Sequence, residues 1–210
     1  MTTPSPGIRE GSASKRDAIV TAARELFLAD GFERTSVDTV AARASVSKRT
    51  VYDYYGDKRR LLLAVVELTI DALASRIEHA LDENLREVSD LEASLVGLAE
   101  SITTSALGSS EYAALRRLIS TESANLPELR QHRWASQEPE EGLAERFAEL
   151  GEQGLLHVPH PRVAADHFVA LTLTPSAASL STSLAPEDAD THRLIVEGVR
   201  AFLRAYAPQS

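Results

Sequence analysis

Apolar side chains recur three or four residues apart along most of the chain, which is the spacing of amphipathic helices. The first such stripe precedes Gly31, a residue type that often follows the last turn of a helix. Ser14 and Asp17 stand three residues apart ahead of the stripe, in the pattern of a capping box. We therefore predict a first helix from Ser14 to about Gly31, with an apolar face of Ile19, Ala22, Ala23, Leu26 and Phe27.

Two short helices separated by a tight turn are predicted next. The stretch Thr35–Asp38 has the spacing of a second capping box, at the start of a short helix that ends near Ala44. Ser45-Val46 forms the turn, and Ser47 can cap a third short helix over Lys48–Tyr54. The apolar positions of these two helices are Val37, Val40, Ala41, Ala44, Val51 and Tyr55.

Longer helices are predicted for the rest of the chain. Asp57 can cap a helix that reaches about Leu85. Pro161 and Pro186 suit the first turns of the last two helices, and Pro175 predicts a kink. No segment alternates apolar and polar residues in the manner of a strand, so we expect an all-α fold. The further helices are predicted over residues 90–106, 110–124, 126–137, 140–153, 162–182 and 187–206.

Three parts of different character divide the chain. Residues 1–13 are polar and include prolines and glycines, so we expect a flexible arm. Residues 14–60 hold the three N-terminal helices, and residues 61–210 hold the longer helices of a larger C-terminal domain.

Charge is distributed unevenly between these parts. The whole chain has a formal net charge of −9, yet residues 1–60 hold 11 Lys and Arg against 8 Asp and Glu. Residues 61–210 hold 11 basic against 23 acidic residues. A basic end on an acidic body favours the approach of DNA to the N-terminal part. The same split also fits a chance asymmetry in a soluble protein.

Several features narrow the class of protein. The absence of cysteine excludes disulfides and thiolate metal sites and fits the reducing cytoplasm, where we expect the protein. No apolar run is long enough to cross a bilayer and the N-terminus lacks a signal sequence, so no membrane partner is expected. His157 and His160 form the only close histidine pair, in a proline-rich loop without acidic neighbours. We therefore expect no metal and no other cofactor.

The two short helices have the layout of a helix-turn-helix. In such a motif the first helix braces the second, whose N-terminal residues face base edges in the major groove. The second helix here combines cationic, hydroxyl and aromatic side chains, and its N-terminal amides suit a phosphate. The same composition also fits a solvated helix face, and Tyr52 fits a packing residue with an exposed tip.

A longer string of residues surrounds this motif in fixed register: Gly31-Phe32, Thr35-Ser36-Val37, Val40-Ala41, Ala44-Ser45-Val46-Ser47-Lys48, Thr50-Val51-Tyr52 and Lys58-x-x-Leu61. In this string the chain resembles the DNA-binding domain of the TetR family of bacterial regulators. The resemblance covers residues 14–60. It involves many positions, whereas a bare helix-turn-helix pattern often arises by chance.

The resemblance implies the positions that contact DNA. Lys48, Arg49 and Thr50 match the base-facing start of the recognition helix. Thr35 and Lys58 match positions that meet phosphates, and the tyrosines of the recognition helix match positions that contact the backbone or thymine methyl groups. The complete predicted set is Thr35, Ser36, Ser47, Lys48, Arg49, Thr50, Tyr52, Tyr54 and Lys58.

Three residues depart from the family pattern. Ser45 stands in the turn, where Gly is usual, and a positive φ would strain it. Arg49 stands where Gly is frequent, and its guanidinium can read guanine or contact a phosphate. Tyr55 replaces Phe, and its hydroxyl needs a partner if it is buried. These departures leave the operator sequence open.

The C-terminal region carries a fainter resemblance. The stretch Glu111–Gly154 is similar to the C-terminal domain of AefR-like members, which implies a ligand-binding and dimerisation domain. A ligand pocket is expected near Trp134, Phe147 or Phe168, although each of these also fits an ordinary core. Family members dimerise through their last two helices, and intramolecular packing is the alternative here. The apolar faces of those helices include Val163, Phe168, Leu171, Leu180, Leu194, Val199, Phe202 and Leu203.

The function that follows from the resemblance is sequence-specific regulation of transcription. We expect a homodimeric repressor that binds a double-stranded DNA operator and is released by a small apolar effector. An enzyme with a vestigial helix-turn-helix is one alternative, but no catalytic motif such as G-x-S-x-G or a P-loop occurs, and we assign no catalytic residue. A DNA-binding protein without a ligand is the other alternative, and a solid C-terminal core would favour it.

Overall fold

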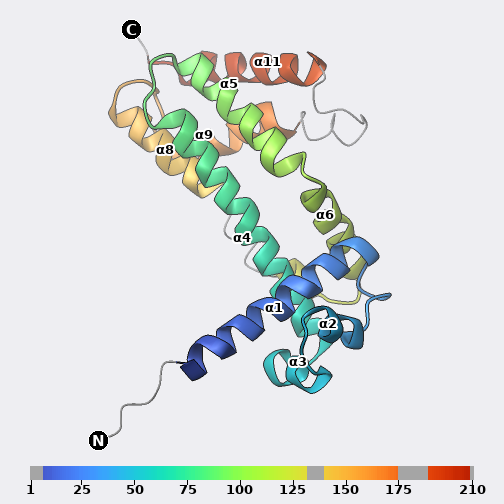
Figure 1. The fold of residues 1–210 in the computed structure, drawn as a ribbon. Helices are drawn as coiled ribbons and strands as arrows, with labels where there is room; N and C mark the ends of the chain where they lie inside the picture. The colour runs from blue at the N-terminus through green and yellow to red at the C-terminus, as the bar shows by residue number, and fades with distance from the viewer. Residues whose placement is uncertain (1–6, 132–139, 175–188, 209–210) are drawn as a thin grey trace, which may run out of the picture. The chain divides into compact units, whose positions relative to one another are not determined.

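The computed structural model describes residues 7–131, 140–174 and 189–208, and the regular elements within these ranges are helical, as predicted (Figure 1). The first elements are α1 (Gly7–Asp30), α2 (Val37–Arg43), α3 (Lys48–Tyr55) and α4 (Lys58–Leu85). They are followed by α5 (Leu91–Ile102), the π-helical turn η1 (Thr103–Leu107), α6 (Ser110–Glu122) and α7 (Glu128–Gln131). The last elements are α8 (Glu140–Glu152), α9 (Pro161–Phe168), the π-helical turn η3 (Val169–Leu173) and α11 (Ala189–Tyr206).

Side-chain caps explain where several helices begin. The Ser36 hydroxyl accepts a hydrogen bond from the backbone N–H of Thr39 (3.0 Å) at the start of α2. Ser47 accepts in the same way from Thr50 (3.1 Å) at the start of α3, and Asp57 accepts a backbone N–H at the start of α4. The predicted caps of the third helix and of the long fourth helix are therefore confirmed.

Two predicted helix starts are wrong. The helix α1 begins at Gly7, so residues 7–13, which we expected in a flexible arm, are helical, and Ser14 lies inside the helix. The Ser-x-x-Asp spacing also occurs in helix interiors, and no proline in residues 7–13 interrupts the helix. At α2 the cap is Ser36 instead of Thr35.

One compact unit holds the helix-turn-helix. It comprises the chain up to Asp71 together with residues 114–134, so it extends beyond the boundary that we predicted at residue 60. The reason is that α4 continues without a break, and its first turns contribute to the core of this unit. Fully buried side chains of this core include Ile19, Phe27, Val40, Val51, Leu61, Leu62 and Val65.

The second compact unit comprises residues 72–113 and 135–210. Aromatic rings from α8, α9 and α11 form the centre of its core, with ring centroids 4.7 to 5.5 Å apart. Gly198 lets α11 approach η3 closely, because a Cβ atom at this position would collide with the backbone carbonyl of Leu171. The clustered rings are Phe147, Phe168, Phe202 and Tyr206.

Only part of the predicted dimerisation face is exposed. Phe168, Val199 and Phe202 are buried in the core of the second unit. Val163 on α9 and Leu194 on α11 remain 46% and 37% exposed, and Leu171 of η3 is also exposed. Pro161 occupies the first turn of α9 as predicted. Predictions for Trp134, Pro175, Leu180 and Pro186 lie outside the described residues.

Candidate nucleic-acid interface

The turn between α2 and α3 has the geometry that the motif requires. Ser45 adopts a φ of 54°, so the left-handed conformation that usually calls for Gly is present here in a serine. The backbone N–H of Ser45 donates to the carbonyl of Ala42 (3.2 Å), and that of Val46 donates to Ala41 (3.0 Å). These bonds close the turn and set the direction in which α3 leaves it.

One face of α3 is anchored in the core of its unit. Val51 and Tyr55 are buried, and the Tyr55 hydroxyl donates to the backbone carbonyl of Arg16 on α1 (3.0 Å). Burial raises the pKa of the Tyr55 hydroxyl, so it stays a neutral donor. The partner that a buried tyrosine needs is thus supplied by α1, which fixes the rotation of α3 about its axis.

The opposite face of α3 carries its polar side chains toward solvent. The Arg49 side chain is 90% exposed, with its Nε 3.9 Å from a carboxylate oxygen of Asp53. Tyr52 is 42% exposed, an unusual value for so large a ring. Tyr54 is half-buried. Helical spacing therefore separates the anchoring residues of α3 from those available to a partner.

Lys48 joins the two helices of the motif. Its Nζ lies 2.8 Å from Oδ2 of Asp38 on α2. The hydrogen bond to this carboxylate, and then its charge, raise the pKa of Lys48, so the ammonium stays charged. No sequence pattern indicated this pair, because Asp38 fitted a capping box equally well.

Hydroxyl groups cluster at the N-termini of both helices. Ser36 and Ser47 are exposed caps, and each also shares a hydrogen bond of 2.8 Å with the threonine three residues further on. For Ser47 that partner is Thr50. These hydroxyls and the N-terminal dipole of α3 suit an anionic group such as a phosphate.

Thr35 does not fit the predicted role of a phosphate contact. It is 3% exposed, and its hydroxyl donates to the carbonyl of Gly31 (2.9 Å) and approaches that of Leu26 (3.3 Å). The hydroxyl therefore ties the α1–α2 turn together and faces away from solvent. We leave Thr35 out of the proposed interface.

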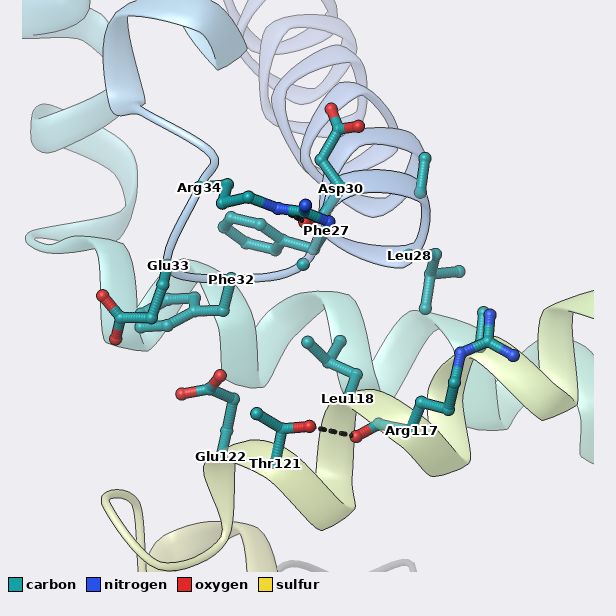
Figure 2. A pocket seen from close by; sticks show the side chains of 13 residues that line it. Phe27, Leu28, Asp30, Phe32, Glu33, Arg34, Arg117, Leu118, Thr121 and Glu122 are labelled. Carbon is teal, nitrogen blue, oxygen red and sulfur yellow. Dashed lines mark hydrogen bonds between the residues drawn. The ribbon is translucent and has the colours of Figure 1, made fainter.

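Lys58, at the start of α4, is half-buried. Its Nζ lies 4.1 Å from the centroid of the Phe32 ring, in a cation–π contact. Phe32 also belongs to a pocket of about 350 Å³ between the α1–α2 turn and α6, all within the first compact unit (Figure 2). The side chains of Glu33 and Glu122 line the same pocket.

The predicted ligand-pocket residues have a different role in this structure. Phe147 and Phe168 are fully buried and contact each other edge to face, with centroids 5.5 Å apart. They are core side chains, because their faces are covered by each other and by Phe202. The third predicted residue, Trp134, lies outside the described residues.

Known protein families match most of the chain. Residues 19–65 match the family described as bacterial regulatory proteins, tetR family. Residues 93–208 match the AefR-like transcriptional repressor, C-terminal domain. The chain belongs to the TetR family. The AefR-like resemblance expected for Glu111–Gly154 is confirmed over this wider range.

Relatives with curated descriptions match part of this TetR family member. The transcriptional activator FasR of Mycolicibacterium smegmatis is 35% identical over 82 residues, which are 37% of this chain and 37% of FasR. The regulator TcmR of Streptomyces glaucescens is 31% identical over 74 residues, 35% of this chain and 33% of TcmR. The match therefore spans about a third of the length of each relative.

Solved structures of bacterial and other regulators match nearly the whole chain. A TetR-family transcriptional regulator from Mesorhizobium loti is 29% identical, with a TM-score of 0.83, over 93% of this chain and 98% of that one. The flavonoid-responsive regulator FrrA is 25% identical, with a TM-score of 0.70, over the same shares of the two chains. No helix within the described ranges is long and apolar enough to cross a membrane.

Proposed function

We propose that this TetR family member binds operator DNA through α3 and represses transcription until a small apolar ligand releases it. The observation that carries the proposal is the two-sided character of α3. Val51 and Tyr55 fix one face in the core, while Arg49 and Tyr52 extend from the other. A helix held rigidly by one face and polar on the other suits the major groove.

The proposed contacts fall into two classes. Arg49 and Thr50 lie at the N-terminal end of α3, where recognition helices meet base edges. Ser36, Ser47 and Lys58 stand at helix starts and suit phosphates. Lys48, Tyr52 and Tyr54 complete the proposed interface. Phosphate contacts would supply most of the affinity, and contacts to base edges would supply the sequence preference.

We also propose that the protein acts as a homodimer. Val163, Leu171 and Leu194 are large apolar side chains left exposed on α9, η3 and α11. Pairing of two copies through these elements would remove this apolar surface from water. Two recognition helices would then read half-sites whose centres are about 34 Å apart, or a multiple of that distance.

Release of the protein from DNA by a small apolar ligand is a separate part of the proposal. FrrA, which resembles this chain over nearly its whole length, is described as flavonoid-responsive. A ligand that binds the DNA-free conformation better would shift the population away from the operator complex. Linkage requires the operator to weaken ligand binding by the same factor. We propose that the protein represses transcription and does not activate it, in line with the AefR-like repressor family that matches residues 93–208.

The decisive test is selection of bound sequences from a random pool of duplexes, followed by fluorescence anisotropy at several salt concentrations. We expect enrichment of a near-palindrome, bound with nanomolar affinity. The double variant Lys48→Ala, Arg49→Ala should lose the enrichment. Arg86→Ala, which removes an exposed arginine outside the proposed DNA and dimer contacts, is the control and should keep it. Failure to enrich any sequence would overturn the proposal, and flavonoids can then be tested as releasing ligands on an enriched duplex.

A further inference from the structure

The first compact unit contains a largely buried acidic side chain, Glu122, at the end of α6. Glu122 is the last residue of α6 and is 3% exposed. Its backbone carbonyl accepts hydrogen bonds from the N–H groups of Asn125 and Leu126 (both 2.9 Å). Across residues 7–131, 140–174 and 189–208, no group forms a hydrogen bond or ion pair with its carboxylate. The side chain lines the pocket beside Phe32, and a positive charge nearby favours the ionised form of a carboxylate in such a largely buried position.

The surroundings of Glu122 identify that charge. Figure 2 shows the carboxylate extending from α6 toward the turn that carries Phe32 and Glu33. Burial and the charge of Glu33 raise the pKa of Glu122, and the positive charge of Lys58 opposes both effects. The same ammonium lies 4.1 Å from the Phe32 ring centroid. Lys58 and Glu122, which carry opposite charges, are therefore both placed beside Phe32, the first over its ring and the second in the pocket that the ring lines.

We propose that Glu122 is a positioning residue for Lys58: its carboxylate attracts the ammonium to the face of Phe32 and so competes with DNA phosphate for it. This inference rests on the proposed function, in which Lys58 meets a phosphate. Glu122 itself touches no DNA in this arrangement. It sets how readily Lys58 can leave Phe32 and reach outward.

The position of Glu122 in the chain would give this proposed attraction a regulatory role. The helix α6 is continuous from Ser110 to Glu122, and its first turn belongs to the second compact unit. A shift or unwinding of the end of α6 would move the carboxylate relative to Lys58. The continuous helix α6 thus joins the second unit to the carboxylate that we propose attracts Lys58.

The chain permits a direct test that needs no DNA, because it has only three lysines, Lys15, Lys48 and Lys58. Reductive methylation with 13C-formaldehyde keeps their charge and gives few NMR signals. The Phe32 ring current should shift the Lys58 methyl signal upfield, and Lys58→Arg assigns it. In Glu122→Gln this signal should move toward that of Lys15, which is exposed.

The matched control for this NMR test is Glu33→Gln, which removes the exposed neighbouring carboxylate. The Lys58 signal should stay near its wild-type position in this control. A Lys58 signal that does not move in Glu122→Gln, or that moves equally in the control, overturns the proposal. If Glu122→Gln fails to fold, Glu122→Asp withdraws the carboxylate by one methylene and should shift the signal in the same direction.

A second test measures competition with phosphate on a mixed-sequence duplex by anisotropy. Glu122→Gln should raise affinity by roughly two- to fivefold, the range expected for one weak ion pair. The gain should vanish in the Lys58→Ala background, and its persistence there would mean general charge repulsion and overturn the proposal. Absence of any binding by the wild-type protein would instead refute the proposed function, while the NMR test still decides the role of Glu122.

Discussion

The serine in the turn of the helix-turn-helix gives a prediction whose sign depends on two opposing effects. Ser45 is exposed and has a φ of 54°, so Ser45→Gly would lose no buried contact. Holding a non-Gly residue in this region costs about 1–2 kcal/mol, which glycine would recover. Glycine also gives the unfolded chain more freedom, which costs about 0.4–1 kcal/mol. The first effect is larger, and we expect a net stabilisation of roughly 0.5–1 kcal/mol.

Ala44 provides the matched control one residue earlier. It has an ordinary φ of −79°, so Ala44→Gly relieves no strain and adds only the freedom of the unfolded chain. We expect this variant to lose about 0.4–1 kcal/mol. The difference between the two variants isolates the conformational strain at Ser45, about 1–2 kcal/mol, or roughly a tenfold change in local opening.

Native-state hydrogen exchange, followed by mass spectrometry on peptides from α2 and α3, measures this local stability. Protection of these peptides should increase in Ser45→Gly and decrease in Ala44→Gly. Equal decreases in the two variants would refute the reasoning, because they would show that the left-handed conformation of Ser45 carries no cost that glycine removes.

Four further outcomes are expected. Arg49→Ala should relax base choice at one operator position and cost about 1–3 kcal/mol on the preferred site, as measured by repeating the selection; an unchanged profile would mean that Arg49 contacts only phosphate. Leu194→Glu should yield monomers in sedimentation velocity, whereas an unchanged sedimentation coefficient would exclude its face from the dimer. Gly198→Ala should lower the melting temperature by several degrees, since its Cβ collides with the Leu171 carbonyl, and an unchanged value would contradict that close approach. The raised pKa of Glu122 means that the folded state binds its proton more tightly than the unfolded state, so stability is lost as pH rises from about 4.5 through the folded pKa. In urea unfolding, the free energy of unfolding of Glu122→Gln should exceed that of wild type by an amount that grows as pH rises across that window. A difference that does not change with pH would contradict the raised pKa.

Local features of the fold could be predicted from the sequence because they depend on neighbouring residues. Ser47 and Asp57 cap helices as expected, since each accepts a hydrogen bond from a backbone N–H only three residues further along the chain. Thr35 was predicted as the cap of α2, whereas Ser36 is the cap in the structure. The Thr35 hydroxyl instead donates to the carbonyls of Gly31 and Leu26, four and nine residues earlier in the chain.

Long-range contacts account for most of what could not be predicted. Glu122 and Lys58 are 64 residues apart in the chain. Their proximity follows from the return of residues 114–134 to the first compact unit, and no periodic pattern encodes that return. The proposed dimerisation faces show the same limit. Apolar residues occur on more than one side of α11, and the packing partners decide that Val199 is buried and Leu194 exposed.

The carboxylates beside the cations of α3 have a consequence for selectivity. Lys48 already has Asp38 as a partner, and Arg49 lies near Asp53. Contact with DNA would therefore exchange one anionic partner for another, and the displaced carboxylates would remain close to the polyanion. Random sequences would offer these cations little net gain, whereas a site with well-placed guanine edges would compensate for the exchange. If the proposed function holds, Asp38 and Asp53 would thus reduce the retention of the protein on DNA of random sequence.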